Sequence, residues 1–139
     1  MAENSGRTMV LTKKYNFIVV DDNKLDSFIA EKIIKNTGKC NQVKTFHYGK
    51  EALDFLATNQ NPEHLNTIIL VDIMMPVMSG FEFVEEFEKL PDEVKSGSSI
   101  YVMSSSINER DLDLVHNYSS VKQYLNKPLN SNNLAILLQ

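Results

Sequence analysis

Short apolar runs that end in an aspartate are the feature that most constrains how this chain can fold. Residues 17–20 read Phe-Ile-Val-Val and lead directly into Asp21-Asp22, and residues 68–71 read Ile-Ile-Leu-Val and lead into Asp72. An unbroken apolar run, without polar alternation, is typical of a strand that is buried on both faces. Such strands occur in parallel sheets covered by helices on both sides. The sequence therefore predicts a parallel sheet with carboxylates at two strand ends.

Segments with helical periodicity alternate with the strands along the chain. The first helix is indicated by apolar residues at helical spacing, namely Leu25, Phe28, Ile29 and Ile33. We expect further strands at 42–46, 100–103 and 121–125, further helices around 52–56 and at 81–90, 109–118 and 131–138, and a polar link at 91–99. Five strands alternating with five helices predict parallel β-α units with right-handed crossovers. The expected fold class is a doubly wound α/β sandwich.

Length, charge and cysteine content exclude several classes of protein. The 139 residues suffice for one domain, expected at residues 15–139 behind a flexible tail at 1–14. The 18 acidic and 14 basic side chains give a net charge of −4, and without a Lys/Arg cluster we expect no nucleic acid partner. No apolar run approaches the roughly 18 residues that span a membrane, so we expect no membrane partner. The single cysteine, Cys40, fits a reducing cytoplasm, because it has no partner for an internal disulfide.

Polar side chains that follow four of the predicted strands indicate phosphate chemistry at one edge of the sheet. They are Asp21, Asp22 and Asp72 after the first and third strands, Ser104 after the fourth and Lys127 after the fifth. Ligands of such sheets bind outside the carboxyl ends of the strands. Three clustered carboxylates repel one another unless a cation is present, and hard oxygen ligands beside a phosphoryl group favour Mg²⁺. A metal-shielded Asp72 can then act as a nucleophile toward phosphorus, while Lys127 neutralises one phosphoryl oxygen and Ser104 donates a hydrogen bond to another.

These residues, in this order, resemble the receiver domain of bacterial two-component response regulators. The resemblance rests on Asp21-Asp22, on the segment Asp-Ile-Met-Met-Pro-Val-Met-Ser-Gly at 72–80, on Ser104 and on Lys127-Pro128, and it covers about residues 16–138. It implies the flavodoxin-like receiver fold in a stand-alone, single-domain protein. It also implies a phosphorelay signalling protein rather than an enzyme with a separate substrate. Asp72 would accept its phosphoryl group from the phosphohistidine of a sensor histidine kinase or a histidine phosphotransfer protein.

The same resemblance implies a metal site. Asp22 and Asp72 would bind Mg²⁺ directly, Asp21 would act through water, and the backbone carbonyl of Met74 would be the remaining protein ligand. Met74 and Ser106 occupy the positions that flank the phosphoryl group in the family and influence how quickly water removes it.

A conformational switch is the third implication of the resemblance. Ser104 matches the family's switch hydroxyl, and Tyr124 matches its switch aromatic. Phosphorylation would draw Ser104 inward, Tyr124 would take the vacated space, and a downstream protein target would recognise the altered surface. The bond between Lys127 and Pro128 is cis in the family, which only an X-Pro bond makes accessible at low energy.

Other interpretations remain open for these residues. Taken alone, Asp21-Asp22 favours capping of the first helix, and Tyr124 favours a half-buried aromatic on an edge strand. A phosphatase of the haloacid-dehalogenase type also uses a strand-end aspartate and Mg²⁺, but its general-acid aspartate would stand where this chain has Met74. A flavin-binding module of similar fold would need a phosphate-cradling loop where the acidic pair stands. An inert interaction module would keep the fold and lose the chemistry, which the complete set of polar residues argues against.

Overall fold

Five parallel strands form one sheet in the order β2-β1-β3-β4-β5. The structure is a computed structural model that describes residues 13–58, 65–106 and 108–138. The strands are β1 (Tyr15–Val20), β2 (Cys40–Phe46), β3 (Thr67–Asp72), β4 (Ser98–Ser104) and β5 (Val121–Asn126). The helices are α1 (Lys24–Asn36), α2 (Gly49–Thr58), α3 (Gly80–Phe87), α4 (Asp92–Lys95), α5 (Glu109–His116) and α6 (Ser131–Leu137). The predicted doubly wound α/β fold is confirmed.

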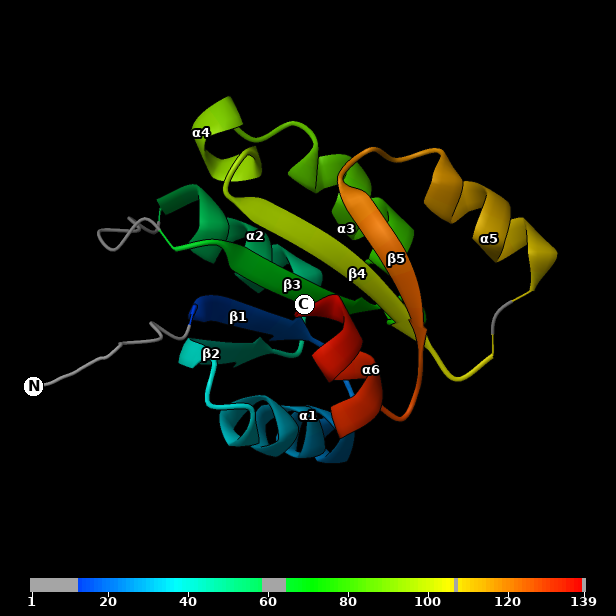
Figure 1. The fold of residues 1–139 in the computed structure, drawn as a ribbon. Helices are drawn as coiled ribbons and strands as arrows, with labels where there is room; N and C mark the ends of the chain where they lie inside the picture. The colour runs from blue at the N-terminus through cyan, green and yellow to red at the C-terminus, as the bar shows by residue number, and fades with distance from the viewer. Residues whose placement is uncertain (1–12, 59–64, 107, 139) are drawn as a thin grey trace, which may run out of the picture.

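The helices cover both faces of the sheet, as Figure 1 shows: α1 and α6 lie on one side, and α2, α3 and α5 lie on the other. Each face has its own apolar core. The central strands β1 and β3 are buried almost throughout, which agrees with their unbroken apolar sequence. Because β2 lies on one side of β1 and β3 on the other, the strand order reverses between β1 and β3. Ligands of doubly wound sheets bind at this reversal, beyond the carboxyl ends of the strands.

Helix α1 forms where it was predicted, but of the four apolar residues that indicated it only Ile33 packs, partly buried, against the core. The residues that it packs against the sheet are Ser27, Ala30 and Ile34. Leu25, Phe28 and Ile29 are instead 66%, 56% and 40% exposed. Small side chains on the buried side let the helix approach the sheet closely, and the Ser27 hydroxyl donates to the backbone carbonyl of Asp21 at 3.1 Å. The helical period was therefore predicted correctly, and the structure adds which side of the helix is buried.

Several boundaries differ from the sequence predictions. The expected polar link at 91–99 contains the one-turn helix α4, so the described residues form six helices rather than five. Asn23, not the acidic pair before it, is the N-cap of α1: its side chain accepts from the backbone N–H of Asp26 at 2.9 Å. The predicted tail lies outside the described residues except for its last two positions. Within the described part of the chain, every helix is too short or too polar to cross a membrane.

Candidate functional site

Three carboxylates meet at the reversal of strand order. Asp21 directly follows β1 and Asp72 ends the neighbouring strand β3, so the two side chains leave the sheet at the same edge. Oxygen atoms of Asp21, Asp22 and Asp72 all lie within 4.8 Å of one another. Asp21 is only 1% exposed and Asp72 6% exposed, whereas Asp22 faces solvent. The cluster is thus buried on one side and open on the other.

Lys127 brings a positive charge to the cluster from the far edge strand. It follows β5, and its backbone N–H donates to the carbonyl of Ser104 at the end of β4 at 2.9 Å. Its Nζ lies 2.7 Å from Asp21 Oδ2, 2.9 Å from Asp26 Oδ2 and 3.2 Å from Asp72 Oδ2. Burial disfavours the charged ammonium, but the hydrogen bonds to Asp21 and Asp26 and the negative charge of Asp72 outweigh it and raise the pKa of Lys127. Its carboxylate partners therefore favour the protonated form of Lys127.

Asp72 occupies the centre of the site. Its Oδ2 faces the Lys127 ammonium, and its Oδ1 accepts from the backbone N–H of Met74 at 3.1 Å. Burial raises the pKa of Asp72, the Met74 hydrogen bond and Lys127 oppose that effect, and the charge of Asp21 adds to it. The raised pKa means that the ionised carboxylate is energetically unfavourable here without further positive charge.

This shift predicts that metal-free protein loses stability as pH rises. Between the ordinary pKa of an aspartate and the raised folded value, the folded state retains a proton that the unfolded state releases, so the free energy of unfolding falls with increasing pH. Asp72→Asn should therefore raise the chemical denaturation midpoint at neutral pH in the presence of a chelator, and this gain should vanish in acid. The exposed neighbour provides the control: an equal gain from Asp22→Asn would contradict burial as the cause.

The donor set fits a divalent cation. Three carboxylates in close proximity, two of them buried and one with a raised pKa, form an excess of hard oxygen ligands. The chain after β3 is held in place by Gly80, whose N–H donates to the carbonyl of Ile73 at 2.9 Å. This contact returns the loop that carries Met74 to the end of β3. A ligand role for the Met74 carbonyl stays a prediction.

Ser104 and Tyr124 are connected through the backbone. The Ser104 hydroxyl, at the end of β4, donates to the Ser106 carbonyl at 2.9 Å and accepts from the Ser106 N–H at 3.1 Å. The Tyr124 hydroxyl donates to the Ser104 carbonyl at 3.1 Å and also lies 2.6 Å from Asn126 Oδ1. Tyr124 is half-buried on the edge strand. The peptide bond between Lys127 and Pro128 is cis. The switch role of the two hydroxyl residues stays a prediction.

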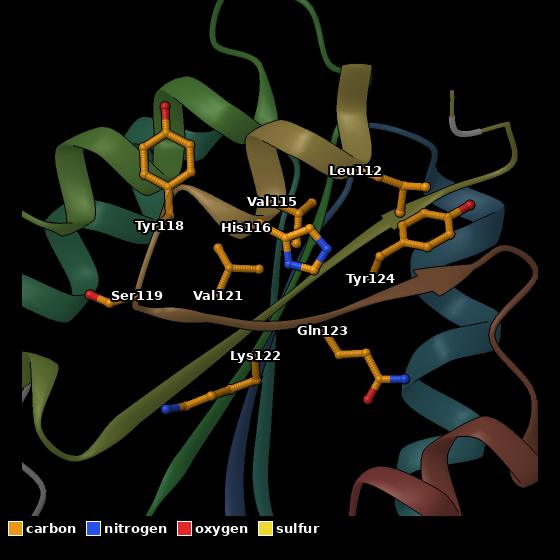
Figure 2. A pocket seen from close by; sticks show the side chains of 9 residues that line it. All are labelled: Leu112, Val115, His116, Tyr118, Ser119, Val121, Lys122, Gln123 and Tyr124. Atoms are coloured by element: carbon orange, nitrogen blue, oxygen red, sulfur yellow. The ribbon is translucent and has the colours of Figure 1, made fainter. Parts of the chain in front are cut away.

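A groove of about 450 Å³ lies between α5 and β5, next to Tyr124. Figure 2 shows its lining, which comprises Leu112, Val115, His116, Tyr118, Ser119, Val121, Lys122, Gln123 and Tyr124. The lining combines aliphatic, aromatic and polar side chains. Tyr124 lines this groove, and its hydroxyl donates a hydrogen bond to the Ser104 carbonyl. The side chain therefore connects the groove to the end of β4.

Asp26 is the residue of this site that sequence reasoning missed. It lies in the first turn of α1, four residues after Asp22, and its carboxylate contacts Lys127. The pattern Asn23-x-x-Asp26 already has an ordinary explanation, because an acidic side chain in the first turn stabilises a helix. The position of Lys127 after a fifth strand does not predict which carboxylates its ammonium contacts.

Comparison with known proteins identifies the fold and the family. The model of the response regulator receiver domain matches residues 17–139. A response regulator receiver protein from Dyadobacter fermentans is 33% identical, with a TM-score of 0.80 over 89% of this chain and 94% of that one. The magnesium-bound receiver domain of the sensor histidine kinase PA1611 from Pseudomonas aeruginosa shares the fold, at 19% identity and a TM-score of 0.72 over 91% of this chain and 95% of that one.

The chain also matches part of a longer relative. A probable histidine kinase 4 from Oryza sativa subsp. japonica is 36% identical over 92 residues, which are 61% of this chain and 9% of that protein. The chain thus spans less than a tenth of that relative, and the proteins that it resembles come from plants as well as from bacteria. The matched residues include the three clustered aspartates and Lys127, and the chain belongs to the response regulator receiver domain family.

Proposed function

We propose that the chain is a phosphoacceptor that takes a phosphoryl group on Asp72 from a phosphohistidine and passes the signal on through protein contacts. One observation carries the proposal: the Asp72 carboxylate lies 3.2 Å from the Lys127 ammonium and beside two further carboxylates at the carboxyl edge of the sheet. The cluster favours a cation, and the cation and ammonium together favour an incoming anionic group. Phosphoryl acceptance on Asp72 would use every member of this cluster.

The transfer step follows from the contacts of Asp72. One of its oxygens attacks phosphorus, the new P–O bond forms, and the P–N bond of the phosphohistidine breaks. The electron pair of the broken bond returns to the imidazole nitrogen, so the product is an acyl phosphate and a free histidine. Lys127 supplies an ammonium within 3.2 Å of Asp72 Oδ2 that binds a phosphoryl oxygen as the new bond forms. The Ser104 hydroxyl donates to a second phosphoryl oxygen if it leaves the Ser106 carbonyl.

Mg²⁺ is the cation we propose for the cluster, held by Asp21, Asp22 and Asp72 with the Met74 carbonyl. When bound, it neutralises charge on the phosphoryl oxygens and shields the attacking carboxylate. The chain's own residues already prepare the site: they bury Asp72, orient it through the Met74 N–H, and leave Asp22 open to solvent.

The proposal is tested by incubating the protein with acetyl phosphate and Mg²⁺ and measuring its intact mass. We expect one added phosphoryl group, located on Asp72 by peptide mapping and absent when a chelator is present. A protein that remains unmodified after prolonged incubation would contradict the proposed function.

The phosphodonor is proposed to be a sensor histidine kinase or a histidine phosphotransfer protein that docks on α1. Leu25, Phe28 and Ile29 form an exposed apolar strip on this helix, which we call the α1 strip. Ile29 lines the same small cavity as Asp21 and Lys127, so the strip borders the site. An apolar strip beside a reactive carboxylate suits a protein donor that must exclude water during transfer.

Phe28→Asp should distinguish phosphoryl transfer from a protein donor, which must dock, from labelling by the small molecule acetyl phosphate. We expect phosphoryl transfer from a phosphohistidine-containing protein to slow by at least about tenfold, because a charged residue replaces the centre of an apolar contact. Labelling by acetyl phosphate, which needs no docking, should be unchanged. Ile136→Asp is the matched control, since Ile136 is an exposed apolar residue of α6. Equal slowing by both variants would rule out a specific role for the α1 strip.

Output is proposed to run through Ser104 and Tyr124 to the groove between α5 and β5. Movement of the Ser104 hydroxyl toward the phosphoryl group would alter the end of β4. In the present structure, the Tyr124 hydroxyl donates to the Ser104 carbonyl at that point. A downstream protein target would recognise the groove in its altered shape. A beryllofluoride-bound structure with both side chains unmoved would contradict this switch. We propose a cytoplasmic location, where the free thiol of Cys40 stays reduced, and protein partners only.

A further inference from the structure

We propose that Asp26 is a positioning residue for Lys127: its carboxylate keeps the ammonium at the site when the other two carboxylates are engaged. The proposal rests on the proposed phosphoacceptor function and adds a residue to it. Asp26 Oδ2 lies 2.9 Å from Lys127 Nζ, closer than Asp72 Oδ2 at 3.2 Å. The Lys127 side chain is only 13% exposed, so water cannot readily replace a lost partner.

The three donors of Lys127 are fully used in the structure. An ammonium has three N–H donors, and here they face Asp21, Asp26 and Asp72. Asp21 and Asp72 belong to the carboxylate cluster that suits a cation, and Asp72 is also the proposed phosphoacceptor. Cation binding and phosphorylation both compete with Lys127 for these two carboxylates. Asp26 lies outside that cluster, so its contact with the ammonium is the one that remains available throughout the reaction.

The local structure of α1 leaves the Asp26 carboxylate available for this contact. In α3, Ser79 and Glu82 form a reciprocal capping box in which the acidic side chain accepts from the N-cap backbone N–H at 2.9 Å. In α1, the corresponding N–H of Asn23 donates to Asp21 Oδ1 at 2.9 Å. The Asn23 side chain still accepts from the backbone N–H of Asp26, which fixes the first turn. Asp26 is thus held by its backbone, and its side chain is free to point at Lys127.

Two consequences follow for the reaction. With Asp26 present, Lys127 can exchange its bonds to the engaged carboxylates for a phosphoryl oxygen and keep one fixed anchor. Without Asp26, no described side chain outside the carboxylates that the cation and the phosphoryl group occupy holds the ammonium. Its long side chain then samples other rotamers, and the contact that stabilises the developing phosphoryl charge is made less often.

The experiment compares Asp26→Ala with Asp111→Ala. Asp111 holds the same first-turn position in α5, with its backbone N–H donating to the Asn108 side chain at 2.9 Å. Neither substitution removes its helix cap, because the cap bond uses the backbone N–H. Thermal unfolding of both variants confirms that they fold.

The first readout is the ammonium itself, observed by NMR with ¹⁵N-labelled lysine in full-length protein. In wild type and in Asp111→Ala, hydrogen exchange of the Lys127 ammonium should stay slow when Mg²⁺ is added. In Asp26→Ala it should become at least about tenfold faster on Mg²⁺ addition, because one charge-assisted hydrogen bond is lost. Equally slow exchange in Asp26→Ala would overturn the proposal.

The second readout is the initial rate of labelling by acetyl phosphate at saturating Mg²⁺. We expect a fall of about tenfold in Asp26→Ala and no change in Asp111→Ala. If wild type is labelled and Asp26→Ala is labelled at the same rate, the proposed role of Asp26 is overturned while the phosphoacceptor function stands. Absence of labelling in wild type would overturn the phosphoacceptor function, and the NMR result would then report on Lys127 independently.

Discussion

Asp72→Ala is expected to reduce labelling by acetyl phosphate to the level of an unfolded protein. The variant removes the proposed nucleophile, and no other carboxylate of the cluster combines burial, the Lys127 contact and the Met74 hydrogen bond. Asp21 is also buried, but its ion pair with Lys127 is shorter, at 2.7 Å against 3.2 Å for Asp72, so its carboxylate is held more tightly. Intact mass and peptide mapping measure the result.

A charge-matched control makes the Asp72 result specific. Asp113→Ala removes an exposed carboxylate of α5 and should label like wild type. Undiminished labelling of Asp72→Ala would contradict the assignment of the phosphoacceptor, since the phosphoryl group would then reside on another side chain. Retained circular dichroism would exclude unfolding as the reason for a loss.

Gly80→Ala is expected to destabilise the protein by about 3 kcal/mol and to disturb the site, because the added methyl group has no space. A Cβ at position 80 would lie 2.6 Å from the carbonyl oxygen of Asp72 and 2.8 Å from the Cα of Ile73. Both are backbone atoms at the end of β3, which cannot rotate away as a side chain would. Urea denaturation measures the stability, and acetyl phosphate labelling measures the displacement of Asp72.

Gly97→Ala is the control for this substitution. A Cβ at position 97 would meet nothing within 4 Å, so we expect a change in the free energy of unfolding of less than about 1 kcal/mol. If both substitutions change the free energy of unfolding by similar amounts, the close approach of the backbone at Asp72 does not exclude a larger residue at position 80.

The strand pattern could be predicted because it is local. Continuous apolar runs that end in aspartates mark β1 and β3, and their burial in the sheet agrees with that prediction. The buried face of α1 could not be predicted in the same way. Hydrophobicity alone favours burial of Leu25 and Phe28. The residues that pack against the sheet are instead Ser27, Ala30 and Ile34. Close packing and the hydrogen bond from Ser27 to the Asp21 carbonyl stabilise this rotation of the helix.

The sequence by itself determined which residue types end which strands, and parallel topology then required Asp21, Asp72, Ser104 and Lys127 to share one edge of the sheet. It did not determine which carboxylates the Lys127 ammonium reaches. That choice depends on the rotation of α1, which brings Asp26 to the site. Contacts between residues a hundred positions apart leave no trace in local periodicity, so only the tertiary structure decided them.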